Sequence, residues 1–300
     1  MVFLIVPMLI SLASPSDARY EPFVMGSLNA LPGLGHAWMG MWRETVEDLT
    51  FTLSPLIAGI GLVSAIDDHD GDPFDLSSMR AGSIAAPMLI TTQNMWFYGM
   101  YRAYRDALSQ PVERLDRLYK KPFDLKLLRS PLVFLGVISF TGLATGLMFI
   151  FDHYRIGLFD RDKVDVFGFR FTPQIGLALH GGYYGILFSG VAVGEEALFR
   201  GMIQTEIEKA TGSAKLAVLG QSLIFGLAHA LNSDNPKGRV LTSFWTGFLG
   251  VYMGLIYRES EEDLGPSIAF HYWYDLLLSI ASYILDPDAG ALTFKAGYKW

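Results

Sequence analysis

Long apolar runs separated by short charged segments dominate the chain. A helix of about 20 apolar residues crosses a hydrocarbon core of about 30 Å. The pattern therefore predicts an all-α, polytopic transmembrane helical bundle with about seven to eight spans. The predicted spans are 50–66, 81–101, 130–151, 176–204, 216–232, 239–257 and 264–285.

Two stretches near the start of the chain are less regular. Residues 2–13 are apolar but short, and no Lys or Arg precedes them. Residues 1–18 are thus interpreted either as a cleaved signal peptide or as a retained hydrophobic arm. The segment 23–42 contains Pro32-Gly33-Leu34-Gly35-His36, which resembles a short motif of small bacterial membrane proteins. It predicts a turn between two short apolar helices, with a broken or re-entrant helix as the alternative.

Basic residues suggest how the bundle is oriented. The loop 102–129 is rich in Arg and Lys, whereas 67–79 is acidic and has neither. The positive-inside rule places 102–129 in the cytoplasm of a multi-pass cell-membrane protein. By alternation, 205–215 and 258–263 lie inside, and 152–174 and 233–238 lie outside. Leucines within the basic loop allow it either to rest on the anionic leaflet or to be simply solvated.

Composition supports a membrane protein. The 300 residues are 51% hydrophobic and 18% charged, whereas soluble domains are roughly a quarter charged. The net charge of −7 argues against a nucleic-acid partner. The chain has no cysteine, which excludes disulfides, thiolate zinc sites and a cysteine nucleophile.

The candidate chemistry is confined to one part of the chain. We interpret 19–129 as an N-terminal membrane region of unknown role and 130–286 as a compact helical core. The sequence of the tail 287–300 gives no indication of a function. Every candidate catalytic residue lies in the core.

Three charged residues interrupt the predicted span 176–204. Apolar residues resume after Glu195, Glu196 and Arg200, and ionisable groups within a membrane cost about 2.5–3.5 kcal/mol each on insertion scales. Glu196 and Arg200 are spaced for an i,i+4 ion pair, which leaves Glu195 on another face as a potential base. The alternative is that the span ends at Gly194 and a cytoplasmic helix follows.

Two histidines in neighbouring spans favour a functional interpretation. Helical rise places Glu195, His229, His271 and Asp275 between about 10 and 20 Å from the cytoplasmic ends of their helices. A single intramembrane histidine is more often a hydrogen-bonded core residue, but here three of the predicted spans bring ionisable groups to a similar depth. For the other histidines we expect structural or solvated roles: His36, His69, His153 and His180.

These residues resemble the glutamate intramembrane proteases of the CPBP family, which includes the prenyl-protein endopeptidases that trim CaaX tails. The family's EExxxR motif corresponds to Glu195-Glu196 through Arg200, and its FxxxH motif to Phe225 through His229. Its third motif, a histidine followed four residues later by Asn or Asp, corresponds to His271 and Asp275. The resemblance extends over about 155–286.

The resemblance implies a water activated by Glu195 with His229. His271 and residue 275 would stabilise the oxyanion, and Glu196 with Arg200 would form a supporting ion pair. The prenyl endopeptidases have Asn where this chain has Asp275. An ionised Asp cannot donate a hydrogen bond, so Asp275 is either protonated or orients and charges His271.

Three functions remain open at this point. The first is an intramembrane endopeptidase without metal or cofactor, acting on a membrane-embedded or membrane-associated protein substrate. The second is a zinc peptidase with His229, His271 and a carboxylate as ligands, although the chain has no HExxH motif. The third is a non-catalytic scaffold, immunity or transport protein of the same fold, because intramembrane charges also line transport paths. A CaaX tail is implied only if the host prenylates its proteins.

Overall fold

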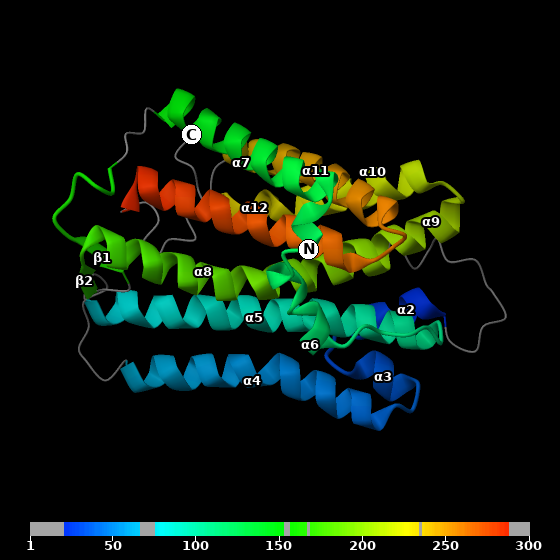
Figure 1. Cartoon of the computed structure of the whole chain (residues 1–300). Helices are drawn as coiled ribbons and strands as arrows, with labels where there is room; N and C mark the ends of the chain where they lie inside the picture. Colours follow the sequence, from blue (N-terminus) through cyan, green and yellow to red (C-terminus); the bar gives the residue numbers. More distant parts are fainter. Residues whose placement is uncertain (1–20, 67–75, 153–156, 167–168, 234–235, 288–300) are drawn as a thin grey trace.

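The fold is a stack of long helices (Figure 1). The computed structural model describes residues 21–66, 76–152, 157–166, 169–233 and 236–287. Residues 1–18, His69 and His153 lie outside the described residues, so the interpretations of them remain predictions.

The described helices bear out the predicted all-α class. They are α2 (Pro22–Leu28), α3 (Leu34–Trp38), α4 (Trp42–Ile66), α5 (Leu76–Ala107), α6 (Leu115–Leu118), α7 (Pro131–Asp152), α8 (Pro173–Glu196), α9 (Thr205–Thr211), α10 (Ala214–His229), α11 (Pro236–Glu259) and α12 (Leu264–Leu285), with short helical turns η1 (Lys121–Phe123), η2 (Leu127–Arg129) and η4 (Ala230–Asn232). A small antiparallel hairpin, β1 (Val164–Val166) with β2 (Phe169–Phe171), was not predicted.

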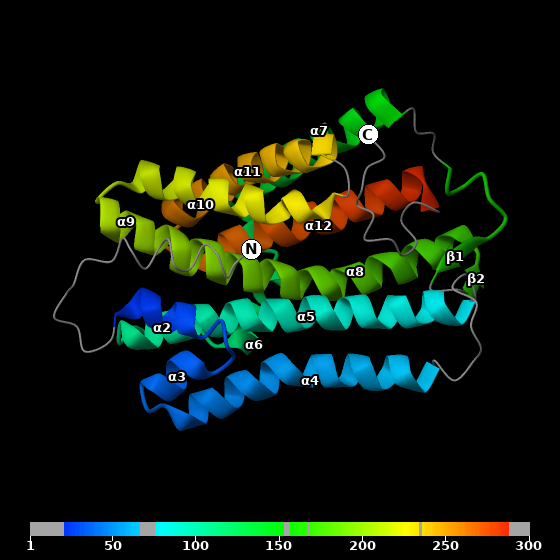
Figure 2. The same ribbon diagram turned by 180° about the vertical axis from the view of Figure 1, so that it is seen from behind.

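The helices pack in a clear order. Helix α4 packs on α5, α5 on α8 and α8 on α12, while α7 and α11 contact α12 and α10 packs on α11. The turn between α11 and α12 lies with α9 at one end of the bundle, and the hairpin lies at the other (Figure 1, Figure 2). Loops predicted to face the same compartment therefore share one end.

Three described helices are long and apolar enough to cross a membrane. They are α7 over Pro131–Met148, α11 over Pro236–Glu259 and α12 over Leu264–Leu285. Helix α10 is apolar but shorter. The chain is therefore a membrane protein with several candidate spans, and the further spans predicted at 50–66, 81–101, 176–204 and 216–232 remain predictions.

The helix that carries the paired glutamates does not stop at Gly194. Helix α8 continues into a π-helical segment, Ala197–Gln204 (η3), and then into α9. Glu195, Glu196 and Arg200 are buried within this continuous rod. The helix is therefore continuous through the three charged residues, and the alternative that the membrane span ends at Gly194 stays a prediction.

The PGLGH motif forms the predicted turn between two short helices, α2 and α3. Gly33 caps α3 in the left-handed conformation with φ of 78°, which a glycine adopts at no steric cost. A side chain at Gly35 would collide with the backbone of Met25. These glycines allow α3 to lie close to α2 and bring His36 into the interior.

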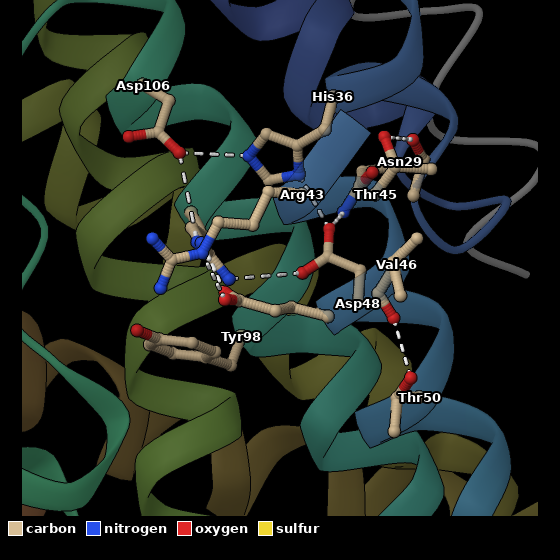
Figure 3. Close-up of polar contacts among 12 residues, drawn as sticks. Asn29, His36, Arg43, Thr45, Val46, Asp48, Thr50, Tyr98 and Asp106 are labelled. Carbon is tan, nitrogen blue, oxygen red and sulfur yellow. Dashed lines mark hydrogen bonds and ion pairs between the residues drawn. The ribbon is translucent and has the colours of Figure 1, made fainter. Parts of the chain in front are cut away.

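His36 is fully buried at the centre of an ionic network (Figure 3). Its Nδ1 lies 2.7 Å from the Asp48 carboxylate of α4, and its Nε2 lies 2.9 Å from the Asp106 carboxylate of α5. The Asn29 amide donates to Asp48 at 2.7 Å, and Arg102 lies within 3.9 Å of Asp106. A ring with carboxylates on both nitrogens is held best as an imidazolium, which agrees with the structural role expected for His36.

The His36 network predicts a pH-dependent stability. Burial alone would lower the pKa of His36, but the hydrogen bonds and charges of Asp106 and Asp48 raise it from 6.5 to about 8. The raised pKa means that this stabilisation is complete below pH 6.5 and is lost as pH rises through about 8, by about 2 kcal/mol in total. Thermal unfolding of the wild type between these pH values should follow this loss.

The Asp106→Asn variant provides the comparison. It removes one of the two carboxylates, so the difference in stability between low and high pH should fall by about half, or about 1 kcal/mol. The other ionisable groups of the network are the same in both proteins: Arg43, Glu47, Tyr98 and Arg102. An unchanged pH profile in the variant would show that His36 does not titrate against Asp106.

Helices α10 and α11 approach each other through small residues. A side chain at Gly226 would collide with the Ser243 carbonyl oxygen and lie 3.0 Å from the Gly247 Cα. At Gly250 it would lie 3.1 Å from the Ser222 Cα. Small residues of this kind permit close helix packing in membranes.

We expect Gly226→Ala to destabilise the protein by about 1–3 kcal/mol, because the obstacle is backbone and cannot rotate away. The same substitution at Gly142 of α7, where an added Cβ meets nothing within 4 Å, should be neutral or slightly stabilising. Melting temperatures of the two variants in the same detergent test this. Equal melting temperatures would contradict the proposed close contact.

Candidate active site

Glu195 lies between two histidine rings contributed by other helices. Its Oε2 is 3.6 Å from His229 Nε2 at the end of α10 and 3.8 Å from His271 Nε2 in α12. Both separations are longer than a direct hydrogen bond. The buried Oε2 has no hydrogen-bond partner among the described residues. The three atoms are therefore spaced to share one small polar molecule rather than to bond to one another.

The tautomer of His229 follows from its other nitrogen. His229 Nδ1 lies 2.8 Å from the carbonyl oxygen of Phe225, one helical turn earlier. A carbonyl can only accept, so Nδ1 carries the proton and donates. In the neutral ring Nε2 is then an acceptor that faces Glu195.

His271 is held from the opposite side by a buried carboxylate. Its Nδ1 lies 2.8 Å from Glu196 Oε1, and the same oxygen accepts from Arg200 at 2.8 Å. Glu196 and Arg200 are both fully buried. The arrangement fixes the His271 ring and points Nε2 toward Glu195.

Asp275 joins the cluster one turn after His271. Its Oδ2 lies 3.3 Å from His271 Nε2, and its side chain remains partly exposed. It therefore faces the same nitrogen as Glu195 does.

Phe225 packs at the centre of the site. Its ring centroid is 4.4 Å from that of His229 and 6.2 Å from that of His271. The Arg200 guanidinium lies over the ring at 4.6 Å, a cation–π arrangement. The aromatic residue of the FxxxH motif thus packs against the buried cation and both imidazoles.

A second set of polar residues supports Arg200 and was not predicted. Arg200 and Gln221 both donate to the Gly250 carbonyl, and Gln204 donates to the Gly254 carbonyl, at 2.9 to 3.3 Å. Gln204 is four residues after Arg200, and Gln221 is four before Phe225, so each shares a helical face with a recognised motif. This four-residue spacing is the feature of the sequence that could have identified both glutamines.

The π-helical segment η3 begins directly after Glu196. Such segments are rare and occur frequently at functional sites. Thr205 Oγ1 donates to the Arg200 carbonyl at 3.2 Å, which supplies a partner for a backbone group within the widened turn.

His180 lies apart from this cluster. Its Nε2 is 2.9 Å from Ser279 Oγ, and its ring stacks on Tyr283 with centroids 4.2 Å apart. It is buried and 15 residues before Glu195 on the same helix, which is about 22 Å of helical rise. The contacts fit the structural role expected for it.

Among the described residues, no group of three or more His, Cys, Asp or Glu side chains has the arrangement of a metal site. The donor set around Glu195 is two imidazole nitrogens and carboxylates, a type of set that zinc accepts.

Comparison with known proteins supports the resemblance. Residues 181–277 match a family model described as type II CAAX prenyl endopeptidase Rce1-like. Residues 181–277 are therefore similar to this family and are called the Rce1-like region below. The Rce1-like region includes every residue of the cluster from Glu195 to Asp275, and the matched family is a family of peptidases. It is shorter at both ends than the 155–286 expected from the motifs. No match was found among curated proteins or among solved structures.

Proposed function

We propose that the protein is an intramembrane endopeptidase that hydrolyses a peptide bond of a membrane-embedded or membrane-associated protein. The main support is the position of the Glu195 carboxylate, 3.6 and 3.8 Å from two histidine nitrogens within the Rce1-like region. The proposal places the basic loop 102–129 in the cytoplasm.

In this mechanism Glu195 is the general base. A water held by Glu195 Oε2 and His229 Nε2 donates one hydrogen bond to each of these acceptors. Glu195 accepts a proton as the water oxygen forms its bond to the scissile carbonyl carbon, and it returns that proton to the amine that leaves when the C–N bond breaks. His229 orients the water because its Nδ1 is already committed to Phe225.

His271 would stabilise the oxyanion of the tetrahedral intermediate. Its Nδ1 donates to Glu196, so an imidazolium can donate from Nε2 to the developing negative charge. Asp275 would favour that imidazolium through its contact with Nε2 and would move aside or lose the contact as the oxyanion forms. Positioned donors of this kind act most strongly where water is excluded.

Cleavage in cells provides the direct test. Membrane proteins from cells producing the wild type and the Glu195→Ala variant are compared by quantitative proteomics of new chain ends. We expect a small set of membrane proteins to be cut only with the wild type. Identical sets in the two cell lines would show that the protein is not a peptidase.

Chelation separates the metal-free mechanism from the zinc alternative. We expect purified protein to keep its full activity after treatment with a zinc chelator, because Glu195 and His229 alone activate the water. Metal content is measured on the same sample. Stoichiometric zinc together with activity that chelation removes and zinc restores would favour the zinc peptidase instead.

A further inference from the structure

The segment between α5 and α7 is fixed to the bundle rather than free in solution. After α5 ends the chain doubles back, and the Tyr98 hydroxyl of α5 donates to the Glu113 carbonyl at 3.1 Å. Further on, Trp273 Nε1 donates to the Pro122 carbonyl at 3.0 Å, and the Phe123 ring lies 5.3 Å from that of Tyr272. Residues 113–129, here named the basic segment, therefore contact α5 and α12 and run across the stack of helices toward α7 (Figure 1).

The outward face of the basic segment combines apolar and cationic side chains. Phe123 and Leu125 are 55% and 63% exposed, although Leu118 and Pro122 of the same segment are buried. Four exposed cations have no ion pair with any residue that the structure describes: Arg117, Lys120, Lys126 and Arg129. This combination of exposed apolar and cationic side chains is typical of interfacial segments.

The position of the basic segment places this face at a membrane surface. The candidate span of α7 begins at Pro131, two residues after Arg129. Leu132, Phe134 and Leu135 at the start of that span are exposed as well. Leu125 is six residues before Pro131, so the chain separates them by no more than about 20 Å. The exposed apolar residues of the basic segment therefore lie close to those at the start of the span.

We propose that the basic segment is a docking surface for anionic phospholipid headgroups. Phe123 and Leu125 insert between the headgroups, and the unpaired cations, Lys126 and Arg129 among them, bind lipid phosphates. Polybasic segments next to a span are attracted to anionic leaflets in this way. Because Tyr272 and Trp273 adjoin His271, the same contacts would hold the candidate active site at a fixed depth below the headgroups.

The absence of cysteine from the chain permits a direct measurement. A Leu125→Cys variant of the full chain is labelled with an environment-sensitive fluorophore and placed in nanodiscs of phosphatidylcholine alone or of equal parts phosphatidylcholine and phosphatidylglycerol. We expect a blue shift of the emission when the anionic lipid is present, and its loss at high salt. A Leu135→Cys label, within the candidate span, should report an apolar environment in both lipids.

A matched pair of charge variants tests the role of the cations. The double substitution Lys126→Gln with Arg129→Gln, made in the Leu125→Cys protein, should remove most of the lipid-dependent emission shift. Each cation near the surface increases partitioning onto the anionic membrane by about fivefold. Lys163→Gln with Arg170→Gln, two exposed cations at the hairpin end, should leave it unchanged.

Three results would overturn the proposal: the same emission in both lipids, equal effects of the two variant pairs, or a shift produced by soluble polyglutamate but not by phosphatidylglycerol. The last would reassign the surface to an acidic protein partner. The fluorescence needs no peptidase activity, so the result is independent of the proposed function.

Discussion

Replacing Glu195 by Gln is expected to lower the peptidase rate by about 10²–10⁴-fold, the usual contribution of a general base. The amide has nearly the same shape as the carboxylate but cannot accept a proton at neutral pH. Folding should be little affected, because Glu195 makes no direct hydrogen bond to either histidine at 3.6 and 3.8 Å. The measurement is cleavage of a reconstituted membrane substrate, with the melting temperature recorded on the same preparation.

Glu259→Gln is the control for this variant. It makes the same chemical change at an exposed position at the end of α11 and should leave both rate and melting temperature unchanged. A Glu195→Gln variant that retains full activity and full function in cells would exclude Glu195 as the base and favour a scaffold or transport role.

Combining substitutions gives a stricter test of the shared water. If Glu195 and His229 bind the same water, either single substitution already prevents activation of that water. The double variant Glu195→Gln with His229→Ala should then be little slower than the worse single variant, as is common for residues that act as a unit. Multiplied losses in the double variant would show that the two groups act independently.

The candidate site of the Rce1-like region could be predicted from the sequence, because its residues occur in short motifs that each lie within one predicted span. A charged residue inside an apolar run has a high free-energy cost of membrane insertion, which identified Glu195, Glu196 and Arg200 as candidates. The regular rise of a helix then predicted that they share a depth with His229 and His271. Even the Glu196–Arg200 pair follows from i,i+4 spacing alone. The structure places all of these side chains together.

Other features depend on contacts between distant segments and left no such pattern. The pairing of His36 with Asp106 joins residues 70 positions apart. The binding of Gln221 to the Gly250 carbonyl depends on how α10 packs on α11. The π-helical segment and the hairpin strands are short compared with the 11–18 residues over which hydrophobic periodicity is assessed, so this periodicity did not predict them.

The buried ion pair beneath the site should be the most sensitive point of the fold. Glu196 and Arg200 are both fully buried, and removing one charge leaves the other in an apolar interior, at a cost of about 3–5 kcal/mol. Arg200→Met is therefore expected to lower the melting temperature by about 10 °C. Arg258→Met is the matched control, because Arg258 makes a comparable bond to Glu208 at 2.8 Å but is exposed, so its loss should cost less than about 1 kcal/mol.

The double variant Glu196→Gln with Arg200→Met separates stability from activity. It leaves no unpaired charge at the two positions, so most of the lost stability should return. Activity should remain at least about tenfold below the wild type, because His271 loses the carboxylate that accepts from its Nδ1 and favours an imidazolium. Recovery of both properties would mean that the pair serves the fold alone, whereas recovery of stability alone would identify Glu196 as the residue that prepares His271 for the oxyanion.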